Sequence, residues 1–138
     1  MIPHGDSPNG QSRAKDGCAE AIRLLSRAVE LDPGLARAWT SLGLAYLVAA
    51  LNGFIDDPAA ARASWRLCTR KALKLDPADF LVRACTGDTR AQDGDRAGAV
   101  VGYELALASA PNHADNLALL AGSFALCAGD PRRGVELA

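Results

Sequence analysis

Side chains that could do chemistry are few in this chain and lie far apart. Histidines occur at His4 and His113, and one acidic pair is formed by Asp56 and Asp57. General acid–base catalysis needs such groups within hydrogen-bond reach of a substrate, but no nucleophile elbow or phosphate-binding glycine loop accompanies them. His113 is interpreted as a solvated residue at a helix start, and the acidic pair as a helix cap. We therefore predict that the chain is not an enzyme and binds no cofactor.

The cysteines do not have the spacing of a metal site or of a dense disulfide framework. They are Cys18, Cys68, Cys85 and Cys127, and no two of them form the C-x-x-C pair that is typical of zinc and redox sites. Each has apolar neighbours of helical character, so we expect buried free thiols and no bound metal. Free thiols indicate a reducing, cytoplasmic location.

Composition excludes two further classes of partner. Fifteen Lys and Arg face sixteen Asp and Glu, for a net charge of −1, and this balance lacks the basic footprint of a nucleic-acid-binding protein. No apolar run reaches the roughly 18 residues that span a bilayer, so we expect no membrane segment. Hydrophobic residues make up 49% of the chain but aromatic residues only 5%. With 28 alanines, this mixture favours closely packed helices over sheets.

Asp-Pro steps divide the chain into helical segments. They begin at Asp32, Asp57, Asp76 and Asp130, and aspartate and proline are both favourable at helix starts. The predicted helices cover 18–31, 35–51, 58–75, 79–92, 95–109, 113–128 and 131 onward. Residues 1–17 are polar and rich in Gly, Pro, Ser and Asn, so we predict a flexible N-terminal segment there.

The segments recur with a fixed period. Pro77 and Pro111 are 34 residues apart (111 − 77), and Pro33 and Pro77 are 44 apart (77 − 33), which is 34 plus an insertion of ten. Trp39 to Tyr46 reproduces the pattern W-x2-L-G-x2-Y. With this period and pattern the chain resembles the tetratricopeptide repeat (TPR) family. The resemblance implies an all-α, right-handed superhelical solenoid of antiparallel helix pairs over 18–138, with about three repeats and incomplete ends.

The same resemblance identifies the residues that should pack between helices. Small residues are expected at close helix crossings and large ones in the wider spaces. The predicted packing residues, small and large together, are Ala21, Ala28, Trp39, Leu42, Gly43, Tyr46, Ala72, Gly87, Ala99, Tyr103, Ala106, Ala121 and Phe124.

Three regions depart from the family pattern. Trp65 stands where a small residue is typical, so we expect its helices to splay or shift locally. The third repeat has Arg83, Thr86 and Arg90 where large apolar residues are usual, although Gly87 keeps the close crossing. The ten extra residues, about 51–60, predict a longer helix followed by a loop at 53–57.

Two interpretations of the apolar pair Phe54-Ile55 in this loop remain open. The pair folds back to cap the helical hairpin, or it is an exposed contact for another protein or domain.

In the TPR family the first helix of each repeat lines a concave groove that binds protein segments. The positions carried over to this chain are Arg37, Thr40, Leu44, Leu47, Leu81, Ala84, Asp88, Asp115, Ala118 and Gly122, with Val48, Gln92 and Leu126 beside them. Thr40, Leu44, Ala84 and Ala118 cannot supply the lysine and asparagine clamp with which chaperone-binding members hold a terminal carboxylate. A helix or extended segment with apolar anchors is the expected partner. Alternatively, Leu47 and Leu126 pack inside the superhelix.

A second function is compatible with the sequence. The lengthened hairpin around 46–77 is similar to TPR regions downstream of effector domains in bacterial signalling proteins, such as class III nucleotide cyclases and winged-helix transcriptional regulators. This resemblance implies a segment of a longer protein that regulates or dimerises its own effector domain in cis. The helix from 131 onward leaves an apolar face uncovered, which predicts a homodimer through that face.

Overall fold

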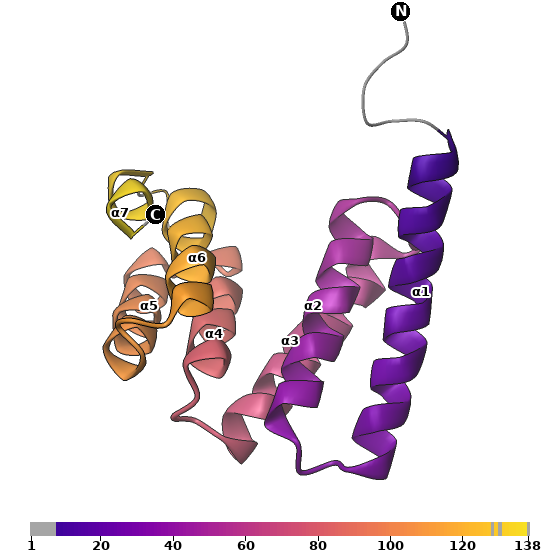
Figure 1. The fold of residues 1–138 in the computed structure, drawn as a ribbon, viewed down its shortest axis with the longest axis horizontal. Helices are drawn as coiled ribbons and strands as arrows, with labels where there is room; N and C mark the ends of the chain where they lie inside the picture. The colour runs from indigo at the N-terminus through magenta and orange to yellow at the C-terminus, as the bar shows by residue number, and fades with distance from the viewer. Residues whose placement is uncertain (1–7, 128, 130, 138) are drawn as a thin grey trace, which may run out of the picture. The chain divides into compact units, whose positions relative to one another are not determined.

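A computed structural model describes residues 8–127, 129 and 131–137, and over these residues the regular structure is helical, without strands. The predicted all-α class is confirmed. The elements are α1 (Pro8–Leu31), α2 (Ala36–Leu51), α3 (Pro58–Leu75), α4 (Phe80–Gln92), α5 (Arg96–Ser109), α6 (Ala114–Gly122), a π-helical segment η1 (Ser123–Cys127) and α7 (Pro131–Leu137) (Figure 1).

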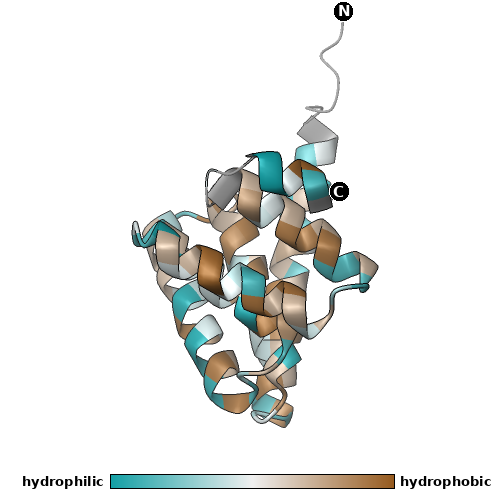
Figure 2. Cartoon of the chain, turned by 90° about the vertical axis from the view of Figure 1, so that its left-hand side faces the viewer, coloured by the Kyte–Doolittle hydropathy of each residue, from teal (hydrophilic) through white to brown (hydrophobic). Residues whose placement is uncertain are grey.

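The helices form two compact units, residues 1–68 and 69–138. The division falls inside α3, after Cys68. The superhelical arrangement and the single domain over 18–138 therefore stay predictions. Brown and teal segments alternate along the helices in Figure 2, as expected for helices that each bury one apolar stripe.

The start of the first helix differs from the prediction. We placed it at residue 18 after a flexible segment, but α1 begins at Pro8; residues 1–7 lie outside the described part of the chain. The polar composition of residues 8–17 argued against order. Tertiary contacts with α2 oppose the disorder that this composition favours. The Cys18 thiol donates to the carbonyl of Ala45 on α2 at 3.4 Å, and the Lys15 side chain lines a pocket between α1 and α2.

This early helix start predicts that Gly17→Ala stabilises the protein. A Cβ on Gly17 would meet nothing within 4 Å, and alanine in an open helix is about 0.5–1 kcal/mol more favourable than glycine. Thermal unfolding followed by circular dichroism measures the gain. As a control, Gly17→Pro should lower the helical signal of the folded protein. If both variants have the melting temperature and the helical signal of the parent, residues 8–17 are not helical in solution.

Only one of the Asp-Pro steps in the described residues opens a helix directly. The Asp57 carboxylate accepts from the Ala60 N–H at 3.0 Å, at the start of α3. Asp32 instead accepts from Gly34 N–H in the turn before α2, at 3.2 Å. In α4 the cap is Asp79, whose Oδ1 accepts from the N–H groups of Leu81 and Val82 at 2.9 and 3.2 Å. Asp130 lies outside the described residues.

In the first unit, α2 packs closely against α3 at Gly43. A Cβ built on Gly43 would lie 3.1 Å from the Cβ of Cys68 and 3.3 Å from the Trp65 backbone oxygen. Of the two outcomes expected at Trp65, splayed helices are wrong, because the small residue of this crossing is on α2 and the indole lies against it; a local shift stays a prediction. Trp65 is 2% exposed.

The rest of this core joins α1 to α2. Val29, Ala38, Leu42 and Cys68 are buried, and the partly buried side chains packed on them are Ile22, Leu25, Ala28, Trp39 and Tyr46. The indole N–H of Trp39 donates to the Pro33 carbonyl at 2.8 Å, which holds the α1–α2 turn against the core. Ala21 is half-buried.

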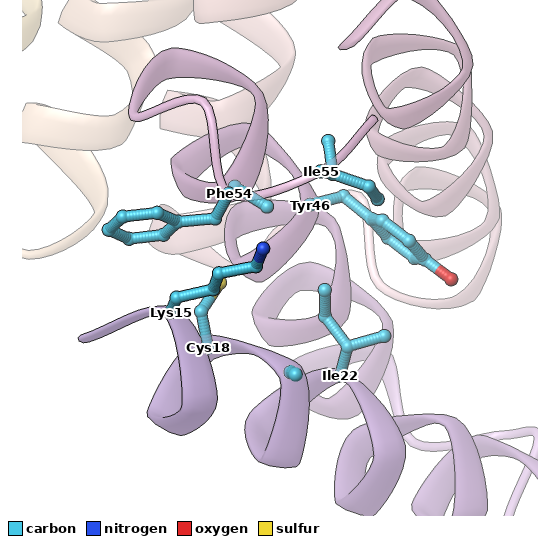
Figure 3. A pocket seen from close by; sticks show the side chains of 8 residues that line it. Lys15, Cys18, Ile22, Tyr46, Phe54 and Ile55 are labelled. Atoms are coloured by element: carbon cyan, nitrogen blue, oxygen red, sulfur yellow. The ribbon is translucent and has the colours of Figure 1, made fainter. Parts of the chain in front are cut away.

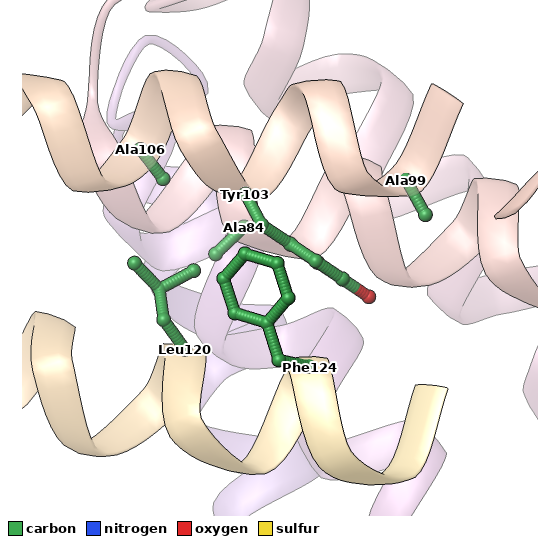
Figure 4. Packing of buried hydrophobic residues seen from close by; sticks show 6 residues of the cluster. All are labelled: Ala84, Ala99, Tyr103, Ala106, Leu120 and Phe124. Atoms are coloured by element: carbon green, nitrogen blue, oxygen red, sulfur yellow. The ribbon is translucent and has the colours of Figure 1, made fainter. Parts of the chain in front are cut away.

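In the second unit the core lies between α4, α5, α6 and η1. Ala84, Ala99, Tyr103, Ala106, Leu120 and Phe124 are at most 1% exposed, and Figure 4 shows the two rings side by side with Leu120 next to them. The ring centroids of Tyr103 and Phe124 are 5.1 Å apart in an edge-to-face arrangement. Ala72 is fully buried and Ala121 is half-buried.

Polar contacts at both ends of this core connect its helices. Asn116 is fully buried, and its side-chain N–H groups donate to the carbonyls of Ala106 and Ala110 at the end of α5, at 3.0 and 3.1 Å. Arg133 of α7 pairs with Glu104 of α5 at 3.3 Å and lies over the Phe124 ring at 5.7 Å. The predicted helix 113–128 is wound as α6 up to Gly122 and as the wider η1 after it.

Candidate functional site

The predicted groove residues of the first unit differ in their accessibility. Arg37 is exposed, and Leu44 and Leu47 are half-buried. Thr40 is 2% exposed, and its hydroxyl donates to the Ala36 carbonyl within α2 at 3.1 Å. A ligand on α2 would therefore contact Arg37 and the leucines but not Thr40. Next to them, Val48 is 45% exposed.

The second unit buries two of its predicted groove residues. Ala84 belongs to the core, where α6 and η1 cover α4. The carboxylate of Asp88 accepts a hydrogen bond from the Tyr103 hydroxyl at 2.5 Å and is 9% exposed. Leu81 and Gly122 are half-buried, and Asp115 and Ala118 are exposed. Because the predicted residues belong to two different compact units, the groove as a whole stays a prediction.

The bond between Asp88 and Tyr103 was not predicted. We assigned Asp88 to the groove and Tyr103 to the packing, and so did not connect them. A signal was present, since a tyrosine buried among alanines needs a partner for its hydroxyl. Asp88, on the preceding helix α4, is an acidic residue that can accept a hydrogen bond from this hydroxyl.

The possible metal ligands and the histidine of the described residues can be placed individually. No three His, Cys, Asp or Glu side chains among them could hold a metal ion. His113 is exposed, its Nδ1 accepts from the Asn116 N–H at 3.4 Å, and its ring lies 4.8 Å from that of Phe80. Within the same residues, no helix combines the length and apolar character that crossing a membrane requires.

The cysteine thiols differ in burial, and this predicts their order of reaction. Cys68 and Cys85 are 3% and 1% exposed, whereas Cys18 is half-buried. Burial raises the pKa of the Cys85 thiol far above its usual range, and the carboxylates of Asp88 and Asp79 raise it further. Because the thiolate is the reactive form, we expect iodoacetamide to label Cys18 before Cys68 and Cys85, which should react only in urea. Peptide mass spectrometry measures this order, and rapid labelling of Cys85 in the folded protein would contradict the burial.

A pocket of about 310 Å³ lies in the first unit between α1, α2 and the turn after α2. Figure 3 shows Phe54 and Ile55 on one side of it and Lys15, Cys18 and Ile22 of α1 on the other. Both Phe54 and Ile55 are half-buried, and the Phe54 N–H donates to the Ala49 carbonyl at 2.9 Å. Of the two interpretations of this pair, the structure supports the one in which it folds back over the helical hairpin.

No known protein family and no curated protein matches this sequence. Each unit thus has accessible apolar side chains among the predicted groove residues or beside them: Leu44, Leu47 and Val48 on α2 in the first unit, and Leu81 on α4 in the second.

Proposed function

We propose that this chain is a non-catalytic interaction module of the TPR type, which acts in the cytoplasm and binds a segment of another protein. Its groove is lined by the first helices of successive pairs, α2, α4 and α6. The partner contributes apolar anchor residues, because the large apolar side chains at the groove positions are Leu44, Leu47 and Leu81. Charged residues of both signs, such as Arg37 and Asp115, flank them.

The observation that carries this proposal is the close helix crossing at Gly43 and again at Gly87. The two glycines are 44 residues apart (87 − 43), one 34-residue period plus the ten-residue insertion. At both, a Cβ would crowd the next helix, at 3.1 Å from the Cβ of Cys68 and at 2.5 Å from the Tyr103 ring. Helix pairs that cross at the same position of each repeat are the building units of solenoids, which bind partners on the surface made by stacked pairs.

A groove variant with a matched control tests the proposal. Leu44→Glu with Leu81→Glu places two charges in the groove, and Leu31→Glu with Leu75→Glu places two charges on leucines that are 70% and 44% exposed elsewhere. The parent and both variants serve as bait in lysate of the source cells, after circular dichroism shows equal melting. A captured protein is then purified and titrated against all three.

We expect the groove variant to bind at least tenfold more weakly than the parent and the control variant to bind like the parent, since desolvating a charge opposes burial of apolar anchors. Equal binding by both variants, or capture of nothing by the parent, would overturn the proposed groove.

Val135 of α7 favours a second candidate function. This side chain is 76% exposed and is available for contact with a second copy of the chain. The candidate is a regulatory or dimerising segment of a larger signalling protein, such as a class III nucleotide cyclase or a transcriptional regulator. Light scattering over a range of concentrations tests self-association. Dimers that Val135→Glu dissociates would support this function, and a monomer at all concentrations would argue against it.

A further inference from the structure

The first helices of the two TPR-like helix pairs, α2 and α4, differ in the residues on one face. Trp39, Leu42 and Tyr46 of α2 pack on the core of the first unit. Forty-four residues later (83 − 39, 86 − 42, 90 − 46) α4 has Arg83, Thr86 and Arg90. The two large aromatic side chains are thus replaced by guanidinium groups, and the leucine by a threonine.

The replacement leaves a groove of about 210 Å³ in the second unit. Its residues come from the end of α3, from α4 and from α5: Leu73, Pro77, Arg83, Thr86, Gly87, Arg90, Val101, Gly102 and Leu105. The backbones approach closely here, since a Cβ on Gly102 would lie 3.4 Å from the Cα of Gly87. Val101 and Leu105, one turn apart on α5, are 56% and 49% exposed.

Arg83 is held in place at this groove by neutral acceptors. Its Nε donates to the Pro77 carbonyl at 3.0 Å, and its Nη1 donates to the Leu105 carbonyl at 3.3 Å and to the Ser109 hydroxyl at 2.5 Å. None of these groups neutralises the positive charge, and Nη2 donates to no acceptor among the described residues. The guanidinium is therefore positioned in advance for an anion, which lowers the entropy lost on binding.

Arg90 adds a second positive charge on the same face of α4. Its side chain is exposed and makes no hydrogen bond or ion pair with the described part of the chain. Residues seven apart on a helix are about 10.5 Å apart along the axis. The groove thus presents an apolar strip with a guanidinium near each end.

We propose that this groove binds an acidic peptide segment in which a large apolar side chain lies between two carboxylates spaced like Arg83 and Arg90. Charge complementarity selects the acidic partner, and the exposed Val101 and Leu105 select the apolar side chain. The volume is below the roughly 300–1,000 Å³ of small-molecule sites, but single side chains of a peptide can enter it.

This surface is separate from the groove of the proposed function. At about 100° per residue, Arg83, Thr86 and Arg90 lie on the side of α4 opposite to Leu81, Ala84 and Asp88. The two proposals can therefore fail independently, and variants on one face test only that face.

Selection from a random peptide library displayed on phage tests the proposal without a known partner. The full chain is the target, and the Arg90→Gln variant is used for counter-selection, because the Arg90 side chain makes no hydrogen bond or ion pair with the described residues that the substitution would break. Arg70→Gln, which removes an exposed charge of α3 outside the groove, is the matched control. Enriched peptides are then synthesised with a fluorophore and titrated by fluorescence anisotropy.

We expect enriched peptides with acidic residues on both sides of a large apolar residue. Their dissociation constant should rise about tenfold or more with Arg90→Gln, since hydrogen bonds to charged groups are among the stronger ones. Leu105→Ser should weaken binding as well, and Arg70→Gln should not. No enrichment, enriched peptides without acidic residues, or equal affinity for Arg90→Gln would overturn the proposal. The proposal would also be overturned if peptides whose apolar residue is replaced by serine bound as tightly as the enriched ones, because charge attraction alone would then explain the binding.

Discussion

Tyr103→Ala is expected to destabilise the second unit by about 3–5 kcal/mol, the range for removing a fully buried aromatic side chain. Tyr103 has no exposed surface and contacts the Phe124 ring at the centre of a core otherwise made of Leu120 and alanines. Alanine side chains are too short to fill the space that the ring would leave. The cavity would therefore persist and add to the lost burial.

The hydroxyl group of Tyr103 can be tested separately. Tyr103→Phe keeps the ring but removes the donor to the Asp88 carboxylate at 2.5 Å. Since a buried charged acceptor would lose a hydrogen bond, we expect a loss of about 1–3 kcal/mol. Urea unfolding followed by circular dichroism measures both variants, with the exposed Val101→Ala as a control. Tryptophan fluorescence reports separately on the first unit, because Trp39 and Trp65 are both in it.

Tyr103→Ala with the stability of the parent would show that this ring is not at the centre of the core. Tyr103→Phe with the stability of the parent would show that the Asp88 carboxylate does not depend on the phenol.

Gly87→Ala is expected to destabilise the same unit by about 1–3 kcal/mol through overpacking. The new Cβ would lie 2.5 and 2.8 Å from two carbons of the Tyr103 ring and 3.1 Å from the Ala99 carbonyl oxygen. The ring cannot easily move aside, because its hydroxyl is bonded to Asp88 and its edge packs on Phe124. In an open helix the same substitution would stabilise by up to about 1 kcal/mol, so the sign of the change is itself informative.

Two other glycines provide graded comparisons for this result. Gly43→Leu should destabilise by about 1–3 kcal/mol or more, because even its Cβ would lie 3.1 Å from the Cβ of Cys68. Gly43→Ala should have a smaller effect than Gly87→Ala, since its contacts are less crowded. Gly17→Ala should have the opposite sign. Thermal melts of the four variants measure the series, and stabilisation by Gly87→Ala would show that α4 and α5 cross elsewhere.

The helices and most of their bounds follow from the sequence alone. Their signals are local: alanine-rich segments, a repeated apolar pattern, and turn residues such as those at 93–95 that stop one helix and start the next. Gly43 and Gly87 were also recognisable as crossing points, because only a residue without a side chain permits two backbones to approach so closely. Such features depend on neighbours in the chain, and the sequence records them directly.

Contacts between distant residues decided the rest. The polar residues 8–17 are helical in a helix that contacts α2 at Cys18 and Ala45, and Trp65 fits without splayed helices because Gly43 lies opposite to it. Asp88 has the helical spacing of the predicted groove residues, but its carboxylate accepts a hydrogen bond from the Tyr103 hydroxyl. The groove of Arg83 and Arg90 exists only because α3 and α5 flank α4 there. The sequence determined which segments are helices and which positions are small, apolar or charged. Only the tertiary structure decided which of those side chains are buried and which are exposed, because burial depends on the helices packed against each position.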